Sequence, residues 1–198
     1  MNTYYFDNGA TTKVKEKVLE EMLPYFSEKY GNPSSVYSLA REAKKGIEEA
    51  REKVANLIGA KKDEIFFTGC GSEADNMALK GIAYINKNKN HIITTKIEHP
   101  AILDTCKFLE RQGFNITYLG VNSQGFINLN ELKKAISDKT ALISIMFANN
   151  EIGTIQAIED IGNIAKANNI YFHTDSVQAA RKCKNRCTKN GDWYVITF

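Results

Sequence analysis

The chain has 198 residues, of which 43% are hydrophobic and 25% are charged. That composition is typical of a soluble globular protein with one sizeable core, and no apolar run is long enough to span a bilayer. Five basic residues and one acid follow Ala180, so the net charge of +3 divides into +4 in the tail and −1 in residues 1–180; the near-neutral body gives no reason to expect a nucleic acid or a membrane as a partner.

The start of the chain lacks the basic region and apolar stretch of a secretory signal, and we therefore expect a cytoplasmic protein. The four cysteines do not form a pattern typical of a disulfide framework. Cys183 and Cys187 are spaced as two metal ligands could be, but no second pair and no nearby histidine completes such a site. We predict no metal.

Short apolar strands alternate with helices along most of the chain. The apolar spacing predicts a helix over 14–29, and the turn at 30–35 predicts the N-cap of a longer helix that ends at Ile58, before Gly59. The expected strands after it are 64–68, 91–95, 115–119, 141–147 and 170–174, and the expected helices are 72–87, 100–112, 129–137 and 158–168. This alternation predicts an α/β fold, with a mostly parallel sheet and helices on both faces.

Ligands of such sheets bind at the carboxyl ends of the strands. After the first expected strand, Gly69 and Gly71 fit the pattern Gly-x-Gly-x-x-Ala, and Ser72 lies where a helix begins. Backbone N–H groups at a helix start, together with the Ser72 hydroxyl, form an anion site. The loop has no lysine and is therefore not a P-loop, and an ordinary strand-to-helix turn explains the pattern equally well.

Two further strand ends carry polar side chains. His99 directly precedes Pro100, which starts a helix, and its imidazole could stack on an aromatic ligand or act as a catalytic acid or base. Asn150 could bind a ligand oxygen. A surface turn remains the alternative at both positions.

The last expected strand ends at a carboxylate, Asp175, with His173 on the same face and Gln178 beyond. A carboxylate at the end of a buried strand requires a positive partner. The candidates are a protonated pyridine nitrogen, a metal ion or a salt bridge. His173 and Asp175 alone supply too few ligands for a metal.

Taken together, these segments resemble the cysteine desulfurases of the class V aminotransferase group, which are pyridoxal 5′-phosphate (PLP) enzymes of fold type I. The resemblance covers nearly everything from Tyr5 to Ala180. The stretches that carry it are 5–12, 31–35, 67–76, 98–101, 149–153 and 173–178.

The resemblance implies a role for each candidate residue. Gly71 and Ser72 match the positions that hold the cofactor phosphate, and His99 matches the residue stacked on the pyridine ring. Asp175 matches the carboxylate that keeps the ring nitrogen protonated, so that the ring acts as an electron sink. The roles left to Asn150 and Gln178 are contacts to the 3-oxygen of the ring and its surroundings.

The resemblance also implies an activity. Members of the family are homodimers that move sulfur from L-cysteine onto an enzyme cysteine as a persulfide, leaving alanine. The sulfur then feeds iron–sulfur cluster assembly, through a scaffold, or another sulfur acceptor.

The sequence departs from the family pattern at several positions. The loop at 68–72 reads Thr-Gly-Cys-Gly-Ser where Thr-Ser-Gly-Gly-Thr is usual, and Tyr37 and Ala40 stand where histidine and glycine are common. After Ala180 the resemblance ends, without the Schiff-base lysine, the nucleophilic cysteine or the substrate-binding arginine of the family. We therefore expect this chain to be inactive alone.

The tail has a separate explanation. Back-translated and shifted by one nucleotide, the tail can spell Ile-Asp-Val-Gln-Lys-Met-Gly-Ile and then Met-Leu-Ser, as a cysteine desulfurase would carry there. We therefore interpret 181–198 as the product of a frameshift in the gene or its sequencing, 13–180 as an incomplete PLP-binding large domain, and 1–12 as the start of a small domain.

Two alternatives remain open. One is another class V enzyme, such as a selenocysteine lyase or an aminotransferase. The other is a non-catalytic nucleotide-binding or dimerising module that uses the loop at 69–74 without PLP.

Overall fold

The computed structural model describes residues 4–86, 88–180 and 194–197 and divides the chain into two units, with the boundary between Phe66 and Phe67. The sequence does not predict a boundary at this point. The division expected after residue 12 stays a prediction, and the interpretation of the tail falls mostly on residues outside the described ranges.

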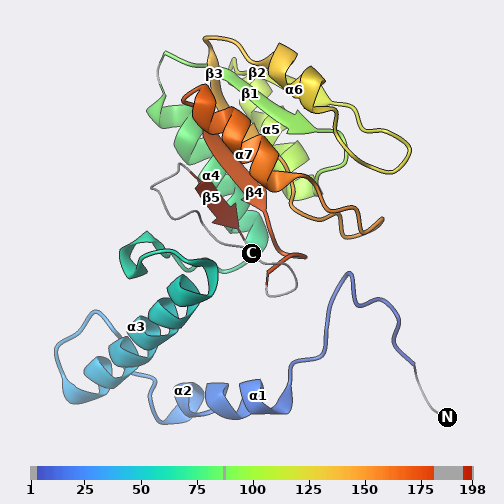
Figure 1. Ribbon diagram of the computed structural model, residues 1–198. Coiled ribbons are helices and arrows are strands. Elements are labelled where there is room, and N and C mark those ends of the chain that lie inside the picture. Colours follow the sequence, from blue (N-terminus) through green and yellow to red (C-terminus); the bar gives the residue numbers. More distant parts are fainter. Residues whose placement is uncertain (1–3, 87, 181–193, 198) are drawn as a thin grey trace. The chain divides into compact units, whose positions relative to one another are not determined.

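The first unit is helical. It contains α1 (Glu16–Met22), α2 (Pro24–Ser27), α3 (Ser38–Ile58) and a 3₁₀ turn, η1 (Lys62–Glu64). The prediction of one helix over 14–29 is wrong, because Pro24 has no backbone N–H to continue α1 and instead starts α2. The first unit of the chain can be followed in blue and cyan in Figure 1.

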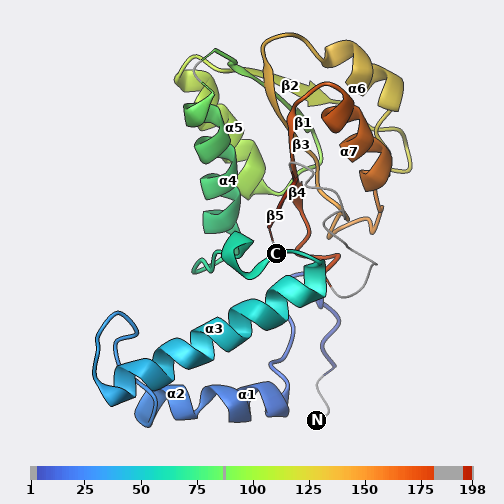
Figure 2. The same cartoon turned by 60° about the vertical axis from the view of Figure 1, so that its left-hand side comes forward.

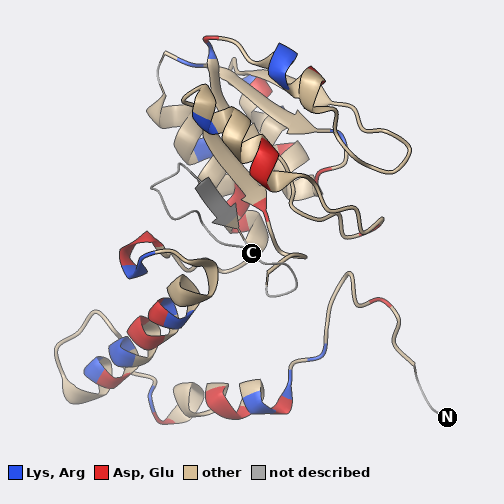
Figure 3. Cartoon of the chain, viewed as in Figure 1, with Lys and Arg blue, Asp and Glu red and all other residues tan. Residues whose placement is uncertain are grey.

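The C-terminal boundary of α3 was predicted correctly, whereas its N-terminal boundary was not. The helix begins three residues after the expected turn, and its N-cap is Tyr37 rather than a serine of that turn. It ends at Ile58 as predicted, because Gly59 adopts the left-handed conformation (φ 75°) that closes a helix without a Cβ clash. Acidic and basic residues alternate along its exposed surface (Figure 3), as in the pair of Lys45 and Glu49 at 3.8 Å.

The second unit is a parallel sheet between two layers of helices. The strands lie in the order β2-β1-β3-β4-β5, and every described pairing is parallel. They are β1 (His91–Thr95), β2 (Asn115–Leu119), β3 (Thr140–Ser144), β4 (Tyr171–Asp175) and β5 (Tyr194–Thr197). The prediction of a parallel α/β sheet is confirmed.

Helices cover both faces of this sheet, as predicted. They are α4 (Gly71–Ile85), α5 (Pro100–Arg111), α6 (Leu129–Ala135) and α7 (Ile158–Ala167). Figure 2 shows α4 and α5 on one side of the strands and α6 and α7 on the other. The side with α4 and α5 has one apolar core, around Leu79, Ile92 and Leu109, and the other side has a second core, around Ile143, Ile161 and Phe172.

One predicted strand is wrong. Residues 65–68 belong to no helix or strand, and no described strand pairs with them. The side chains of Phe66 and Phe67 are 71% and 51% exposed, so the apolar run that predicted a buried strand lies largely open to solvent. The edge beside β4 is instead occupied by β5, which the sequence did not predict.

The described residues contain neither a candidate membrane span nor a cluster of metal-binding side chains. No helix among them combines the length and the apolar character that crossing a bilayer requires. No group of three or more metal-binding side chains lies together in the same residues.

Candidate functional site

The loop before α4 presents an uncapped helix start. Cys70 is the N-cap residue, and its side chain makes no capping hydrogen bond. Glu73 does not cap the helix start either, because its Oε2 accepts from the amide of Gly69 at 2.6 Å. Ser72 is exposed on the first turn of this 15-residue helix. The helix start can therefore offer amide and hydroxyl donors to an anion.

This loop lies beside the segment that follows β4. A Cβ atom placed on Gly71 would lie 3.4 Å from Cγ2 of Val177, which is two residues beyond Asp175. The backbone of the loop at Gly71 therefore lies within side-chain contact distance of that segment. The structure brings together the two ends that sequence analysis joined only through a family resemblance.

His99 lies at the N-terminus of α5. Its Nδ1 accepts a hydrogen bond from the amide of Ala101 at 3.1 Å, so the neutral ring carries its proton on Nε2. The exposed imidazole and Ser72 line the same hollow, which has a volume of about 390 Å³. The other residues that line it are Asn76, Lys80, Pro100, Ala101, Asp104, Thr105 and Phe108.

Asp175 ends β4 as a half-buried carboxylate. Its Oδ1 accepts from the amide of Val177 at 3.0 Å. Burial raises the pKa of Asp175, and the nearby charge of Asp75 adds to this, whereas the Val177 amide, His173 and His99 act in the opposite direction. Such a carboxylate gains from a cationic partner, since a positive charge offsets the cost of its burial.

His173 serves the interior of the sheet rather than a metal site. It is fully buried, with Nδ1 2.9 Å from Ser144 Oγ and Nε2 3.3 Å from Thr197 Oγ1 and 3.5 Å from Asp75 Oδ1. Thr197 Oγ1 also donates to Asp75 Oδ1 at 2.5 Å. This network joins β3, β4, β5 and α4 beneath Asp175.

The two asparagines after β3 have different surroundings. Asn149 is buried: its Nδ2 donates to the carbonyl of Ile97 at 3.0 Å, and its Oδ1 accepts from the amides of Glu151 and Ile152. Asn150, the predicted cofactor contact, is exposed, and Gln178 is half-buried in the turn after Asp175. Asn149 therefore fixes the loop, and Asn150 is the asparagine that a ligand could reach.

Sequence analysis assigned no role to Glu98, which is 5% exposed. It accepts from Thr95 Oγ1 at 2.7 Å and, through both carboxyl oxygens, from the amide of Met146 at 3.0 and 3.1 Å. Burial raises its pKa to about 8. The only signal in the sequence was a carboxylate next to His99 at a strand end.

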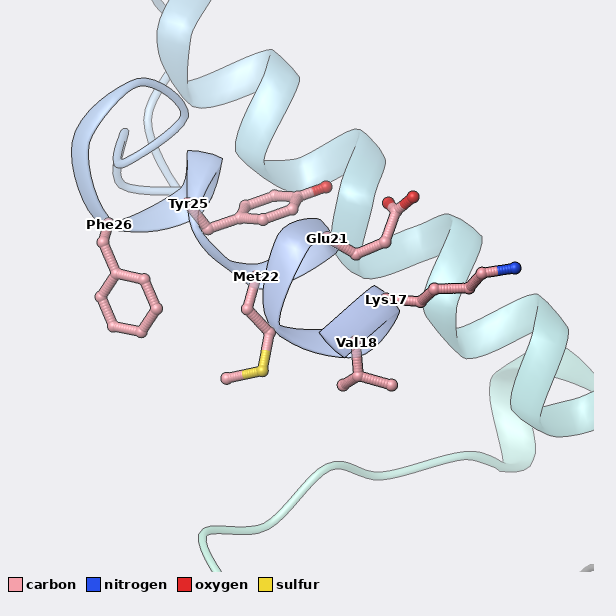
Figure 4. A pocket seen from close by; sticks show the side chains of 6 residues that line it. All are labelled: Lys17, Val18, Glu21, Met22, Tyr25 and Phe26. Carbon is pink, nitrogen blue, oxygen red and sulfur yellow. The ribbon is translucent and has the colours of Figure 1, made fainter. Parts of the chain in front are cut away.

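A second hollow, of about 600 Å³, lies on α1 and α2. It is lined by Lys17, Val18, Glu21, Met22, Tyr25 and Phe26. Figure 4 shows Tyr25 pointing toward α3, where a side chain at Gly46 would collide with it, while Val18, Met22 and Phe26 point the other way. None of the predicted site residues lines this hollow.

Comparison with known proteins gives a consistent result for the whole chain. A family model described as Aminotransferase class-V matches residues 4–194. The cysteine desulfurase IscS of Clostridium botulinum (strain Kyoto / Type A2) is 61% identical over 176 residues, which are 88% of this chain and 44% of that protein. The cysteine desulfurase IscS of Methanosarcina thermophila is 57% identical over the same shares of the two chains.

Solved structures share the fold. A NifS-like protein matches with a TM-score of 0.86 and 49% identity, over 88% of this chain and 49% of its own. A structure of SspA in complex with cysteine matches with a TM-score of 0.87 and 46% identity, over 89% and 51%. The chain therefore spans about half the length of the relatives that it matches.

Proposed function

Because this chain belongs to the class V aminotransferase family, we propose that it is the cofactor-binding part of a PLP-dependent cysteine desulfurase. The observation that carries the proposal is the approach of Gly71 to the segment after Asp175. It lets an anion held at the start of α4 and a cation held by Asp175 belong to one ligand. PLP has that pair of charges, a phosphate and a protonated pyridine nitrogen.

The residues around this point fit such a ligand. The uncapped start of α4, with Gly71 and Ser72, would hold the phosphate. Asp175 would pair with the ring nitrogen, and the cation would relieve the cost that burial imposes on this carboxylate. His99 would lie on the ring, and Asn150 and Gln178 near its 3-oxygen.

When bound, PLP supplies an electron sink for bonds broken at the substrate's carbon atoms. The chain's own part is binding and orientation. The charge on Asp175 would keep the proton on the ring nitrogen, and the hydrogen bond from Ala101 to Nδ1 of His99 leaves Nε2–H as the donor of its neutral ring.

The names of the relatives point to the substrate. The two IscS proteins are named cysteine desulfurases, and SspA was solved with cysteine bound, which supports L-cysteine as the substrate. We propose that the full-length protein is a cytoplasmic homodimer that passes sulfur to an iron–sulfur scaffold or another acceptor. A selenocysteine lyase or aminotransferase activity would require different substrate contacts around the same cofactor.

Binding of the cofactor is the direct test. The probe is pyridoxamine 5′-phosphate, whose amine cannot condense with surface lysines, titrated into the full 198-residue chain by calorimetry. Replacing Asp175 by Ala removes a charge-assisted hydrogen bond, so we expect the Kd to rise roughly 10- to 100-fold. An absorbance scan with PLP should lose the perturbation of the cofactor spectrum in the same variant.

Asp160→Ala is the matched control, since Asp160 is an exposed carboxylate on α7. It should bind the probe as the unaltered chain does. Equal affinity for the probe in Asp175→Ala would contradict the proposed function. Binding of adenosine phosphates in preference to pyridoxamine 5′-phosphate would indicate a nucleotide-binding module instead.

A further inference from the structure

Glu98 joins two loops that come from different strands. Its carboxyl group accepts from Thr95 Oγ1, at the end of β1, and from the amide of Met146, two residues beyond the end of β3. The two attachment points are separated by about 50 residues of sequence but lie on adjacent strands. The side chain of Glu98 therefore links the carboxyl ends of β1 and β3 through hydrogen bonds.

A second contact ties the same two loops. Nδ2 of Asn149 donates to the carbonyl of Ile97 at 3.0 Å. The residues directly beyond these contacts are His99 on one loop and Asn150 on the other, and both are exposed. The buried residues Glu98 and Asn149 thus directly precede His99 and Asn150, the two exposed candidates for cofactor contacts.

We propose that Glu98 is a positioning residue that holds His99 and Asn150 in register for the cofactor ring, an inference that rests on the proposed function. It acts through Thr95 and Met146 and does not itself touch the ligand. Its carboxyl group keeps these hydrogen bonds in the neutral form, because a carbonyl oxygen accepts as a carboxylate oxygen does.

The surroundings of Glu98 favour the neutral form near pH 7. Burial is the main cause, and the carboxylates of Asp175 on β4 and Asp75 on α4 raise its pKa further, whereas the bonds from Met146 and Thr95 lower it. Cys106 of α5 also faces this carboxyl group, and burial raises the pKa of its thiol to about 12, so it adds no negative charge at neutral pH. Opening of these contacts would hydrate the carboxyl group and lower its pKa, so the contacts should weaken as the pH rises toward 8 and change no further above it.

The test compares Glu98→Gln and Glu98→Ala with the unaltered chain and with Glu131→Gln, a control at an exposed glutamate of α6. Two readouts need no cofactor: the hydrogen-exchange protection of the Met146 amide, and the NMR signals of the His99 ring. The third is the Kd for pyridoxamine 5′-phosphate between pH 5 and 9.

We expect Glu98→Ala to lower the protection of the Met146 amide at least tenfold and to shift the NMR signals of the His99 ring. The Kd for pyridoxamine 5′-phosphate should rise at least tenfold. Glutamine, which keeps an accepting oxygen, should restore all three near pH 7. It should also abolish a loss of protection and affinity that the unaltered chain shows as the pH rises from about 5 to 8. Glu131→Gln should change nothing.

Unchanged His99 signals and Met146 protection in Glu98→Ala would overturn the inference. If that variant does not fold, the pH series decides: the same loss between about pH 5 and 8 in Glu98→Gln and in the unaltered chain would overturn it as well. Failure of the unaltered chain to bind the probe would overturn the proposed function, while the two cofactor-free readouts would still decide whether Glu98 positions His99.

Discussion

Burial of the Glu98 carboxyl group has a consequence for stability that depends on pH. The pKa of this group lies near 4.5 in the unfolded chain and near 8 in the folded one, with burial as the main cause. Between these values the folded state binds the proton and the unfolded state does not. The free energy of unfolding should therefore fall as the pH rises, by up to about 1.4 kcal/mol per pH unit from this group.

Glu98→Gln removes this titration and keeps the accepting oxygen. We expect the variant to gain stability relative to the unaltered chain as the pH is raised from 5 to 8, with no further difference above that range. Urea unfolding at a series of pH values measures the difference, and Glu131→Gln is the control. A difference between Glu98→Gln and the unaltered chain that stays constant from pH 5 to 8 would show that Glu98 is ionised in the folded protein.

At the level of single residues, sequence reasoning pointed to candidate residues that belong to a local pattern and missed one that does not. Gly71, Ser72, His99 and Asp175 could be picked out because each stands at a strand end or a helix start. Glu98 could not, because its importance depends on the Met146 amide reaching it from another strand. A one-dimensional pattern does not contain such a contact.

Among the elements, the turn before α3 depends on a glycine. A Cβ atom on buried Gly31 would lie 2.5 Å from the carbonyl carbon and 2.6 Å from the carbonyl oxygen of Leu39, which are backbone atoms of the first turn of α3. Backbone atoms cannot move aside as a flexible side chain can. The turn and the helix would have to separate to admit even a methyl group.

We expect Gly31→Ala to lower the free energy of unfolding of its unit by about 1–3 kcal/mol, the usual cost of overpacking. Gly81→Ala is the matched comparison, because Gly81 lies within α4 and a Cβ atom there meets nothing within 4 Å. Alanine at that position should stabilise the helix by about 0.5–1 kcal/mol. Thermal unfolding of both variants measures the contrast, and equal shifts would contradict the role of Gly31.

The elements that the sequence predicted well are those with a local cause. The strands β1 and β3 are buried throughout their length, with apolar residues at their centres, and α3 and α5 carry a glycine stop and a proline start. The failures have non-local causes. Residues 65–68 have the apolar character of a strand but belong to none of the described strands, and a strand alone is not stable.

For the molecule as a whole, the fold explains where a ligand would bind, and the residues at that place determine which ligand it would be. The parallel sheet accounts for why the ends of β1, β3 and β4 lie at one edge, which is where such sheets bind ligands. The residues at that edge are those that we propose to bind PLP. Neither supplies a nucleophile for sulfur transfer, which is a separate requirement of a cysteine desulfurase.

The described thiols show why this chain should not release sulfur from cysteine by itself. Cys106 is fully buried, and burial raises the pKa of its thiol to about 12, so it forms almost no thiolate at neutral pH and no substrate can reach it. Cys70 is exposed but occupies the N-cap of α4, at the expected phosphate site.

We therefore expect the purified chain, supplied with PLP and L-cysteine, to form no sulfide above a protein-free control. A methylene blue assay measures the sulfide, with a full-length cysteine desulfurase as the positive control. Turnover that depends on the chain and disappears in Cys70→Ser would assign the nucleophile to this loop and contradict the expectation.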